Sequence, residues 1–261
     1  VTTGVKDPSG NSMSSDNTTG TGFTTQDGAP PTEPIVSGTT PTNDTTPTWS
    51  WSSGGGGNGT YRYKLDDSDL TSGATQTTST SYTPGSGISE ASHILYVQER
   101  DAAGNWSSSG SRTIVIDNTA PTVSGVAITS ATGVQNNFVN AGDVVSVTAT
   151  FDENVSVTGT PQLTLVVGTT DRTATYTSGS GGTTLVFTYT IQAEETDTDG
   201  ISIGADALAL NSSTISDGAG NNATTLTHSA VSANSSYMVD TTAPTLTVSS
   251  VSLSADTGTS S

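Results

Sequence analysis

Short segments in which apolar and polar residues alternate run through most of the chain. The clearest are Thr48-Trp49-Ser50-Trp51-Ser52 and Val144-Val145-Ser146-Val147-Thr148-Ala149-Thr150-Phe151. A period of two is typical of a strand with one buried face and one face in water. The same pattern predicts further strands at 61–65, 94–98, 113–116, 163–167, 172–177 and 185–191.

The segments between these strands have the composition of tight turns. Glycine-rich stretches at 54–59 and 178–182 each separate two predicted strands and are suited to hairpin loops. Good helix formers do not gather at helical spacing, although residues 205–210 are open to a short helical turn. Many short strands without intervening helices predict an all-β fold of antiparallel β-sandwiches.

Two short motifs recur in the same order along the chain. The loop motif Asp-x-x-Gly-Asn occurs at 7–11, 101–105 and 217–221, and a junction with Asp before Pro occurs at 27–30, 117–121 and 240–244. Each loop precedes its junction, as expected for tandem repeats. We therefore expect a C-terminal remnant of a preceding domain at 1–29, complete domains at 30–120 and 121–243, and the first strand of a following domain at 244–261.

Several of these stretches together resemble a known class of repeats. They are Pro47-Thr48-Trp49-Ser50-Trp51, Tyr61-Arg62-Tyr63-Lys64-Leu65-Asp66, the run from Leu95 to Asn105, Gly159-Thr160-Pro161-Gln162-Leu163 and Asp199-Gly200-Ile201-Ser202-Ile203. The chain is similar in them to bacterial immunoglobulin-like tandem repeats of large extracellular surface adhesins. The resemblance implies immunoglobulin-like sandwiches in an extended array, a place at the cell surface, and Ca²⁺ at domain junctions.

Composition narrows the classes of partner. The 261 residues include 24 acidic and 6 basic side chains, and the formal net charge of −18 repels nucleic acid. Without a long apolar run, we expect no direct membrane insertion. The absence of cysteine excludes disulfides and thiolate metal sites.

Short carboxylates in loops are the side chains that calcium sites use. The loop motif offers an Asp and an Asn around a turn-forming Gly, although the same residues also form a plain turn without metal. A junction carboxylate could meet loops of both neighbouring domains. The expected calcium ligands are Asp101, Asn105, Asp117, Asp152, Asp197, Asp199, Asp217, Asn221 and Asp240.

An enzymatic role is not expected. The chain has two histidines, His93 and His228, and lacks a Gly-x-Ser-x-Gly elbow, a His-Glu-x-x-His motif and a phosphate loop. We therefore interpret it as a structural extender, or stalk, of an extracellular adhesin, whose partners are neighbouring repeats of the same protein.

Two other functions remain open. One is a glycan-binding module that stacks sugars on exposed aromatic residues, and exposure of Trp49 and Trp51 would separate it from the stalk, because core packing is the usual role of such residues. The other is a self-assembling sheath or S-layer subunit, in which the end strands at 1–29 and 244–261 pair with further copies.

Overall fold

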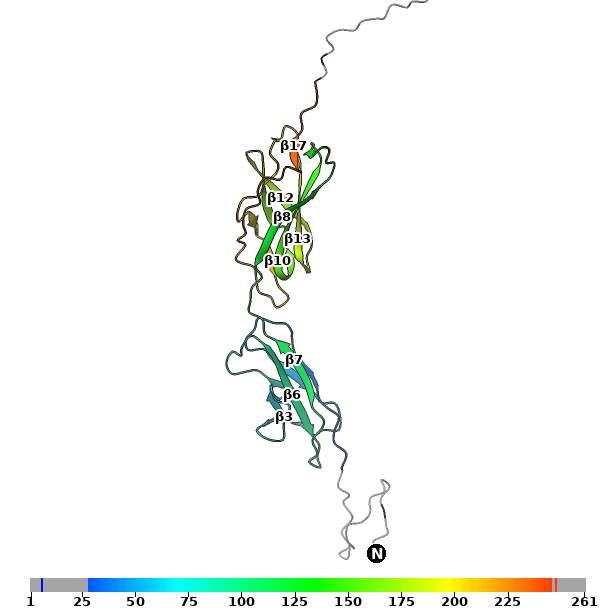
Figure 1. The fold of residues 1–261 in the computed structure, drawn as a ribbon. Helices are drawn as coiled ribbons and strands as arrows, with labels where there is room; N and C mark the ends of the chain where they lie inside the picture. Colours follow the sequence, from blue (N-terminus) through cyan, green and yellow to red (C-terminus); the bar gives the residue numbers. More distant parts are fainter. Residues whose placement is uncertain (1–5, 7–27, 246, 248–261) are drawn as a thin grey trace, which may run out of the picture. The chain divides into compact units, whose positions relative to one another are not determined.

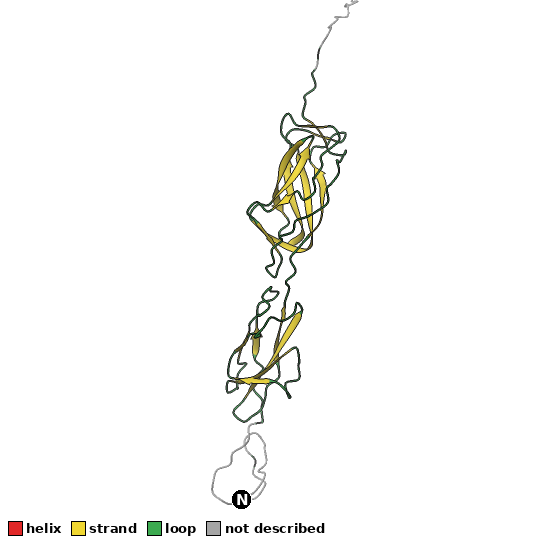
Figure 2. Cartoon of the chain, turned by 90° about the vertical axis from the view of Figure 1, so that its left-hand side faces the viewer, coloured by secondary structure: helices red, strands yellow, loops and turns green. Residues whose placement is uncertain are grey.

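The computed structural model describes Lys6, residues 28–245 and Thr247, and the regular elements in this part of the chain are β-strands (Figures 1 and 2). The predicted all-β class is confirmed, and no described segment forms a helix that could cross a membrane. The chain divides between Thr119 and Ala120 into two compact units, unit 1 and unit 2. The expected remnant at 1–29 and strand at 244–261 lie almost entirely outside the described residues.

The described part of unit 1 consists of two antiparallel sheets. Its strands are β1 (Ile35–Ser37), β2 (Trp49–Ser52), β3 (Thr60–Leu65), β4 (Thr75–Thr77), β5 (Ser81–Tyr82), β6 (Ser92–Arg100) and β7 (Gly110–Val115). One sheet has the order β1-β2-β5 and the other the order β4-β3-β6-β7. Because their buried side chains join in one cluster, the two sheets enclose a common core.

Aromatic residues fill much of the core of unit 1. Trp49 and Trp51 of β2 are 0% and 5% exposed and pack with Tyr61 of β3. The rings of Trp51 and Tyr61 meet edge to face, with centroids 5.9 Å apart. From the other sheet, β6 contributes Leu95 and Val97 to the same cluster. A domain poor in Leu and Phe thus gains its buried area from tryptophan and tyrosine.

Unit 2 is built around the fifteen-residue strand β10 (Val144–Thr158). The main sheet has the order β15-β11-β12-β13-β10-β16, with β8 also paired to β10, and a smaller sheet has the order β14-β17-β9. The other strands are β8 (Val123–Ala131), β9 (Phe138–Val139), β11 (Gln162–Val167), β12 (Thr170–Ser178), β13 (Gly182–Thr190), β14 (Thr196–Asp197), β15 (Leu208–Ala209), β16 (Thr214–Ser216) and β17 (Met238–Asp240).

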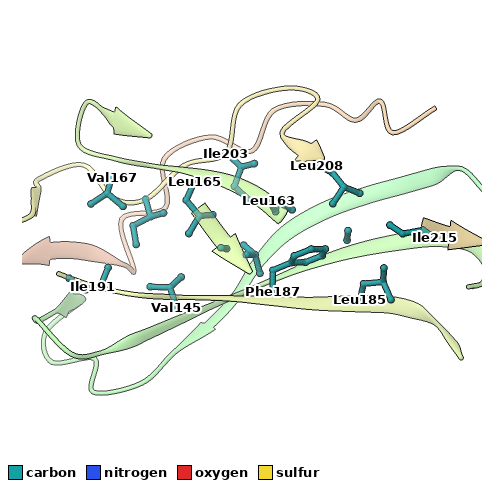
Figure 3. Close-up of a cluster of buried hydrophobic side chains, with 14 of the residues drawn as sticks. Val145, Leu163, Leu165, Val167, Leu185, Phe187, Ile191, Ile203, Leu208 and Ile215 are labelled. Carbon is teal, nitrogen blue, oxygen red and sulfur yellow. The ribbon is translucent and has the colours of Figure 1, made fainter. Parts of the chain in front are cut away.

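The core of unit 2 is aliphatic, with Phe187 among its largest buried side chains (Figure 3). Alternate residues of β10 and β11 enter it. On β10 these are Val145, Val147, Ala149 and Phe151, and on β11 they are Leu163, Leu165 and Val167. This is the period-two burial that the sequence predicted for both strands.

Two local expectations were wrong. Residues 205–210 form no helical turn, because Leu208 belongs to strand β15 and packs into the core beside its partner Leu163. The apolar and aromatic residues of 121–243 also predicted a core that includes Tyr176, Val186 and Tyr189, and all three are only half-buried. The neighbours of Val186, Leu185 and Phe187, point inward instead, since adjacent residues of a strand face opposite sides.

Candidate functional site

In the loop motif of unit 1, the aspartate side chain accepts hydrogen bonds from later residues of the same loop. Asp101 Oδ1 accepts hydrogen bonds from the backbone N–H groups of Gly104 at 2.6 Å and Asn105 at 2.8 Å, and Oδ2 accepts one from the Asn105 side-chain amide at 2.8 Å. Gly104 has a φ of 105°, which favours glycine. Burial opposes ionisation of Asp101, but these hydrogen bonds outweigh it and hold the pKa of Asp101 below its ordinary value.

The loop motif of unit 2 has the same geometry. Asp217 Oδ1 accepts from the backbone N–H groups of Gly220 and Asn221 at 2.7 and 2.8 Å, and Oδ2 accepts from the Asn221 side-chain amide at 2.7 Å. The motif therefore has a structural use in both units. Calcium binding by Asp101, Asn105, Asp217 and Asn221 stays a prediction, and the third copy at 7–11 lies outside the described residues.

The junction aspartates also share one local geometry. Asp117 Oδ1 accepts from the backbone N–H of Thr119 at 3.1 Å, and Asp240 Oδ1 accepts from that of Thr242 at 2.9 Å. Each carboxylate thus forms a turn with the residue two positions later. The repeated junction sequence therefore forms the same turn after Asp117 and after Asp240.

A buried glutamate adjoins the loop of unit 1. Glu99 is 1% exposed, accepts hydrogen bonds from Ser53 Oγ at 2.5 Å and the Gly59 N–H at 3.2 Å, and has no ion-pair partner among the described residues. Sequence reasoning missed Glu99. The signal was its position two residues after Val97 on β6, which places it on the inward face.

Unit 2 also holds carboxylates close to its loop. One carboxylate oxygen of Glu153 lies within 4.8 Å of one of Asp217. Next to Glu153, Asp152 accepts hydrogen bonds from the Thr122 N–H at 2.8 Å and the Thr122 hydroxyl at 2.6 Å. These bonds, the side-chain one above all, lower the pKa of Asp152. Asp152 therefore fastens the start of unit 2 to β10, while Glu153 and Asp217 form an acidic pair.

The remaining expected ligands, Asp197 and Asp199, are not gathered into this pair. Asp197 is buried, and its carboxylate accepts from the backbone N–H groups of Gly168 at 2.7 Å and Gly200 at 2.8 Å. Its side chain therefore joins two turns of unit 2. Asp199 is exposed, and its backbone N–H donates to Asp197 at 3.3 Å.

Both histidines are engaged in structural hydrogen bonds. His93 Nδ1 lies 2.7 Å from Asp66 Oδ2, and its Nε2 lies 2.9 Å from the Ser89 carbonyl oxygen. His228 Nε2 accepts from the Ala207 N–H at 2.8 Å, beside a groove of about 530 Å³ lined by 123–126 and 227–231. Ser89 Oγ also lies 3.5 Å from His93 Nε2, so Ser89, His93 and Asp66 follow one another in the order of a Ser-His-Asp arrangement. His93 Nε2 lies closer to the Ser89 carbonyl oxygen than to the hydroxyl, however, and that contact makes Nε2 a donor and not the acceptor that a general base needs.

The two tryptophans whose exposure would have favoured the glycan-binding alternative are not available for stacking. Trp49 and Trp51 are both buried, as described above, so neither presents a ring face to a ligand. The glycan-binding interpretation therefore loses the platform on which it was based. Trp106, by contrast, is half-buried.

Comparison with known proteins gives only distant likenesses. No protein-family model matches the chain, and no curated protein sequence matches it. Two similar solved structures are the chitinase ChiA74 from Bacillus thuringiensis, at 16% identity and a TM-score of 0.29, and a 1.5-MDa bacterial ice-binding adhesin, at 18% identity and a TM-score of 0.29. The matches cover 66% and 81% of this chain and 29% and 66% of theirs, respectively. Neither is close enough to assign a function.

Proposed function

We propose that the chain is a structural extender segment of an extracellular bacterial surface adhesin, in which β-sandwich units follow one another as a stalk. The observation that carries this proposal is that each of two consecutive units has its own hydrophobic core. Ile116 is buried in the core of unit 1 and Pro121 is also buried, so only residues 117–120 lie between the buried ends of the two units. Units that fold separately on short connections suit a spacer.

The immunoglobulin-like character of the units is part of the same proposal. Unit 1 supports it through its sheet orders, β1-β2-β5 and β4-β3-β6-β7, in which strands distant in sequence are neighbours in a sheet. Such crossing between two antiparallel sheets is typical of immunoglobulin-like sandwiches. The repeated loop and junction geometries support a tandem array, whose partners are neighbouring repeats.

Calcium is the proposed ligand that stiffens the array. Hydrogen bonds, a cation or a metal can offset the hydration that a buried carboxylate loses, and Glu99 has hydrogen bonds from Ser53 and Gly59 but no ion-pair partner among the described residues. In unit 2, the acidic pair of Glu153 and Asp217 places two like charges within 4.8 Å. Calcium takes six to eight oxygen ligands and would relieve both situations. The junction carboxylates of Asp117 and Asp240 are the proposed additional ligands.

Thermal unfolding with and without calcium tests the metal proposal. Calcium that binds only the native state stabilises it by about 2.7 kcal/mol at a hundredfold excess over Kd. We expect millimolar calcium to raise the melting temperature of unit 2, and Glu153→Gln to abolish that rise. Asp171→Asn, which removes the same charge from an exposed position, is the matched control and should keep it. Equal melting curves in calcium and chelator would remove the metal from the proposal.

Pulling the chain from its two ends tests the stalk. Independent units should give two unfolding events, which release about 300 Å and about 400 Å of chain at roughly 3.3–3.6 Å per extended residue. A single event that releases both lengths together would contradict a stalk of separate units. This measurement needs no metal, so it tests the stalk and the calcium separately.

A further inference from the structure

The few cations of this acidic chain are unevenly distributed and incompletely paired. Four of the six, Arg62, Lys64, Arg100 and Arg112, lie between residues 62 and 112 of unit 1. Lys64 forms an ion pair with Asp67 at 2.6 Å, and Arg172 of unit 2 pairs with Glu195. Within the described part of the chain, the arginines of unit 1 have no carboxylate at ion-pair distance. That is unexpected where acidic residues outnumber basic ones 24 to 6.

Two of these arginines lie on the outer face of the sheet β4-β3-β6-β7. Tyr61 and Val97 are buried, so strand alternation places Arg62, Gln98 and Arg100 on the opposite side. Arg62 lies directly across from Gln98 in the β3–β6 register. The Arg62 Nε–H donates to the Gln98 side-chain oxygen at 2.8 Å, which fixes the plane of the guanidinium.

Both arginines contact the ring of one tryptophan. The guanidinium carbon of Arg62 lies 4.4 Å from the ring centroid of Trp106, and that of Arg100 lies 5.8 Å from it. Cation–π attraction at these distances holds both guanidiniums against the same ring. Burial lowers the pKa of Arg62, and the charge of Asp69 opposes that shift only in part. The face therefore concentrates positive charge that an anion would relieve.

We propose that this arginine–tryptophan face, made of Arg62, Gln98, Arg100, Trp106 and Tyr96, binds a carboxylate-bearing sugar residue within an otherwise neutral glycan. A guanidinium presents two parallel N–H donors that match a carboxylate. Tyr96, half-buried and two residues from Gln98 on the same side of β6, offers an aromatic surface to a sugar ring. The site is distinct from the buried Trp49 and Trp51 and does not depend on calcium or on the stalk.

The negative net charge of the chain favours a glycan with a single carboxylate over polyanions. At a net charge of −18, the chain repels polyanions and other copies of itself over long range. A single carboxylate on a neutral oligosaccharide can bind Arg62 and Arg100 and adds little to the electrostatic repulsion between the ligand and the acidic chain. The complementarity is therefore local, and we expect binding to weaken as salt rises.

An NMR titration with a matched pair of oligosaccharides tests the site. The probe is a xylo-oligosaccharide with one glucuronate branch, compared with the same oligosaccharide without the branch, in chelator and at moderate salt. We expect the glucuronate form alone to shift the indole N–H resonance of Trp106 in a saturable manner. Arg62→Gln and Arg100→Gln should each weaken binding about tenfold or more, as for loss of a charged hydrogen bond.

Arg112→Gln is the control, because it removes the same charge from the same sheet. The Arg112 guanidinium donates to the Gly38 carbonyl oxygen at 3.1 Å, and the described cation–π contacts of Trp106 are with Arg62 and Arg100 instead. The Arg112→Gln variant should bind the glucuronate-bearing oligosaccharide with the same affinity as the unaltered protein. Equal weakening in all three variants, equal binding of the unbranched oligosaccharide, or no saturable shift would each overturn the proposal. Melting curves establish that every variant is folded.

Discussion

The carboxylate of Asp66 holds both the ring and the backbone of the segment that begins β6. Its Oδ2 lies 2.7 Å from His93 Nδ1, and its Oδ1 accepts the backbone N–H of Ile94 at 2.7 Å. Because His93 Nε2 faces the Ser89 carbonyl oxygen, both ring nitrogens meet acceptors. This arrangement is satisfied fully only by the charged, doubly protonated imidazole.

This pair predicts a dependence of stability on pH. Burial opposes the charge on His93, but the hydrogen bonds to Asp66 and Ser89 outweigh it and raise the pKa of His93 above 6.5. The contribution is therefore complete below pH 6.5 and lost as pH rises through the higher folded pKa. Urea unfolding of unit 1, followed by tryptophan fluorescence, should show this loss as the pH rises above 6.5. An unchanged pH profile in His93→Gln would refute it.

The core of unit 2 predicts a large local effect of truncation. Phe151→Ala should cost about 3–5 kcal/mol, as for other buried phenylalanines. Val134→Ala, at a position 39% exposed in the same unit, is the control and should change stability by less than about 0.5 kcal/mol.

The distribution of tryptophan allows the two units to be followed separately. All three tryptophans, at 49, 51 and 106, lie in unit 1. We expect Phe151→Ala to shift the unfolding transition seen by circular dichroism and to leave the tryptophan transition in place. If the fluorescence transition moved by the same amount, the units would not be independent in folding.

The loop motif predicts weakening in acid. The pKa of Asp101 is lowered, so its contribution is present above its ordinary value of 3.8 and is lost as pH falls through the folded pKa. Asp101→Ala leaves the N–H groups of Gly104 and Asn105 without their acceptor and should lower the melting temperature of unit 1. Serine in place of exposed Asp44 is the comparison that should alter it little. An unaffected melting temperature in Asp101→Ala would show that the loop does not depend on its carboxylate.

The end segments separate a stalk from a self-assembling subunit. For a stalk, light scattering should give a monomer both for the full chain and for a version limited to 30–243. Oligomers that depend on concentration and require the end segments would favour assembly through the end strands. Removal of 1–29 alone would then identify which end is needed.

The strands were predictable because each buries one face. Trp49 and Trp51 on β2 are spaced by two and are both buried, as are Val145, Val147, Ala149 and Phe151 on β10. Val186 was misjudged because Leu185, Val186 and Phe187 are consecutive apolar residues, and alternation alone does not choose a face in such a run.

The candidate site was less predictable, since it depends on contacts between distant residues. The Asp-x-x-Gly-Asn repeat identified both loops. The same residues suit a hydrogen-bonded turn and a metal site, so the sequence alone did not show which of the two the loops form. Glu99 was missed because a carboxylate is rarely expected in a core. The contacts of Arg62 and Arg100 with Trp106 arise from the pairing of β3 with β6, which brings together residues far apart in the chain.

The parallel pairing of β9 with β17 bears on the order of folding during synthesis. Met238 pairs with Phe138, and Val239 with Val139, so the last described strand of unit 2 joins a segment about a hundred residues earlier. A chain that emerges from the ribosome amino end first has all the strands of unit 1 available once Ile116 has appeared. The smaller sheet of unit 2 cannot form until residues up to Asp240 have been synthesised. We therefore infer that unit 1 folds while unit 2 is still being synthesised.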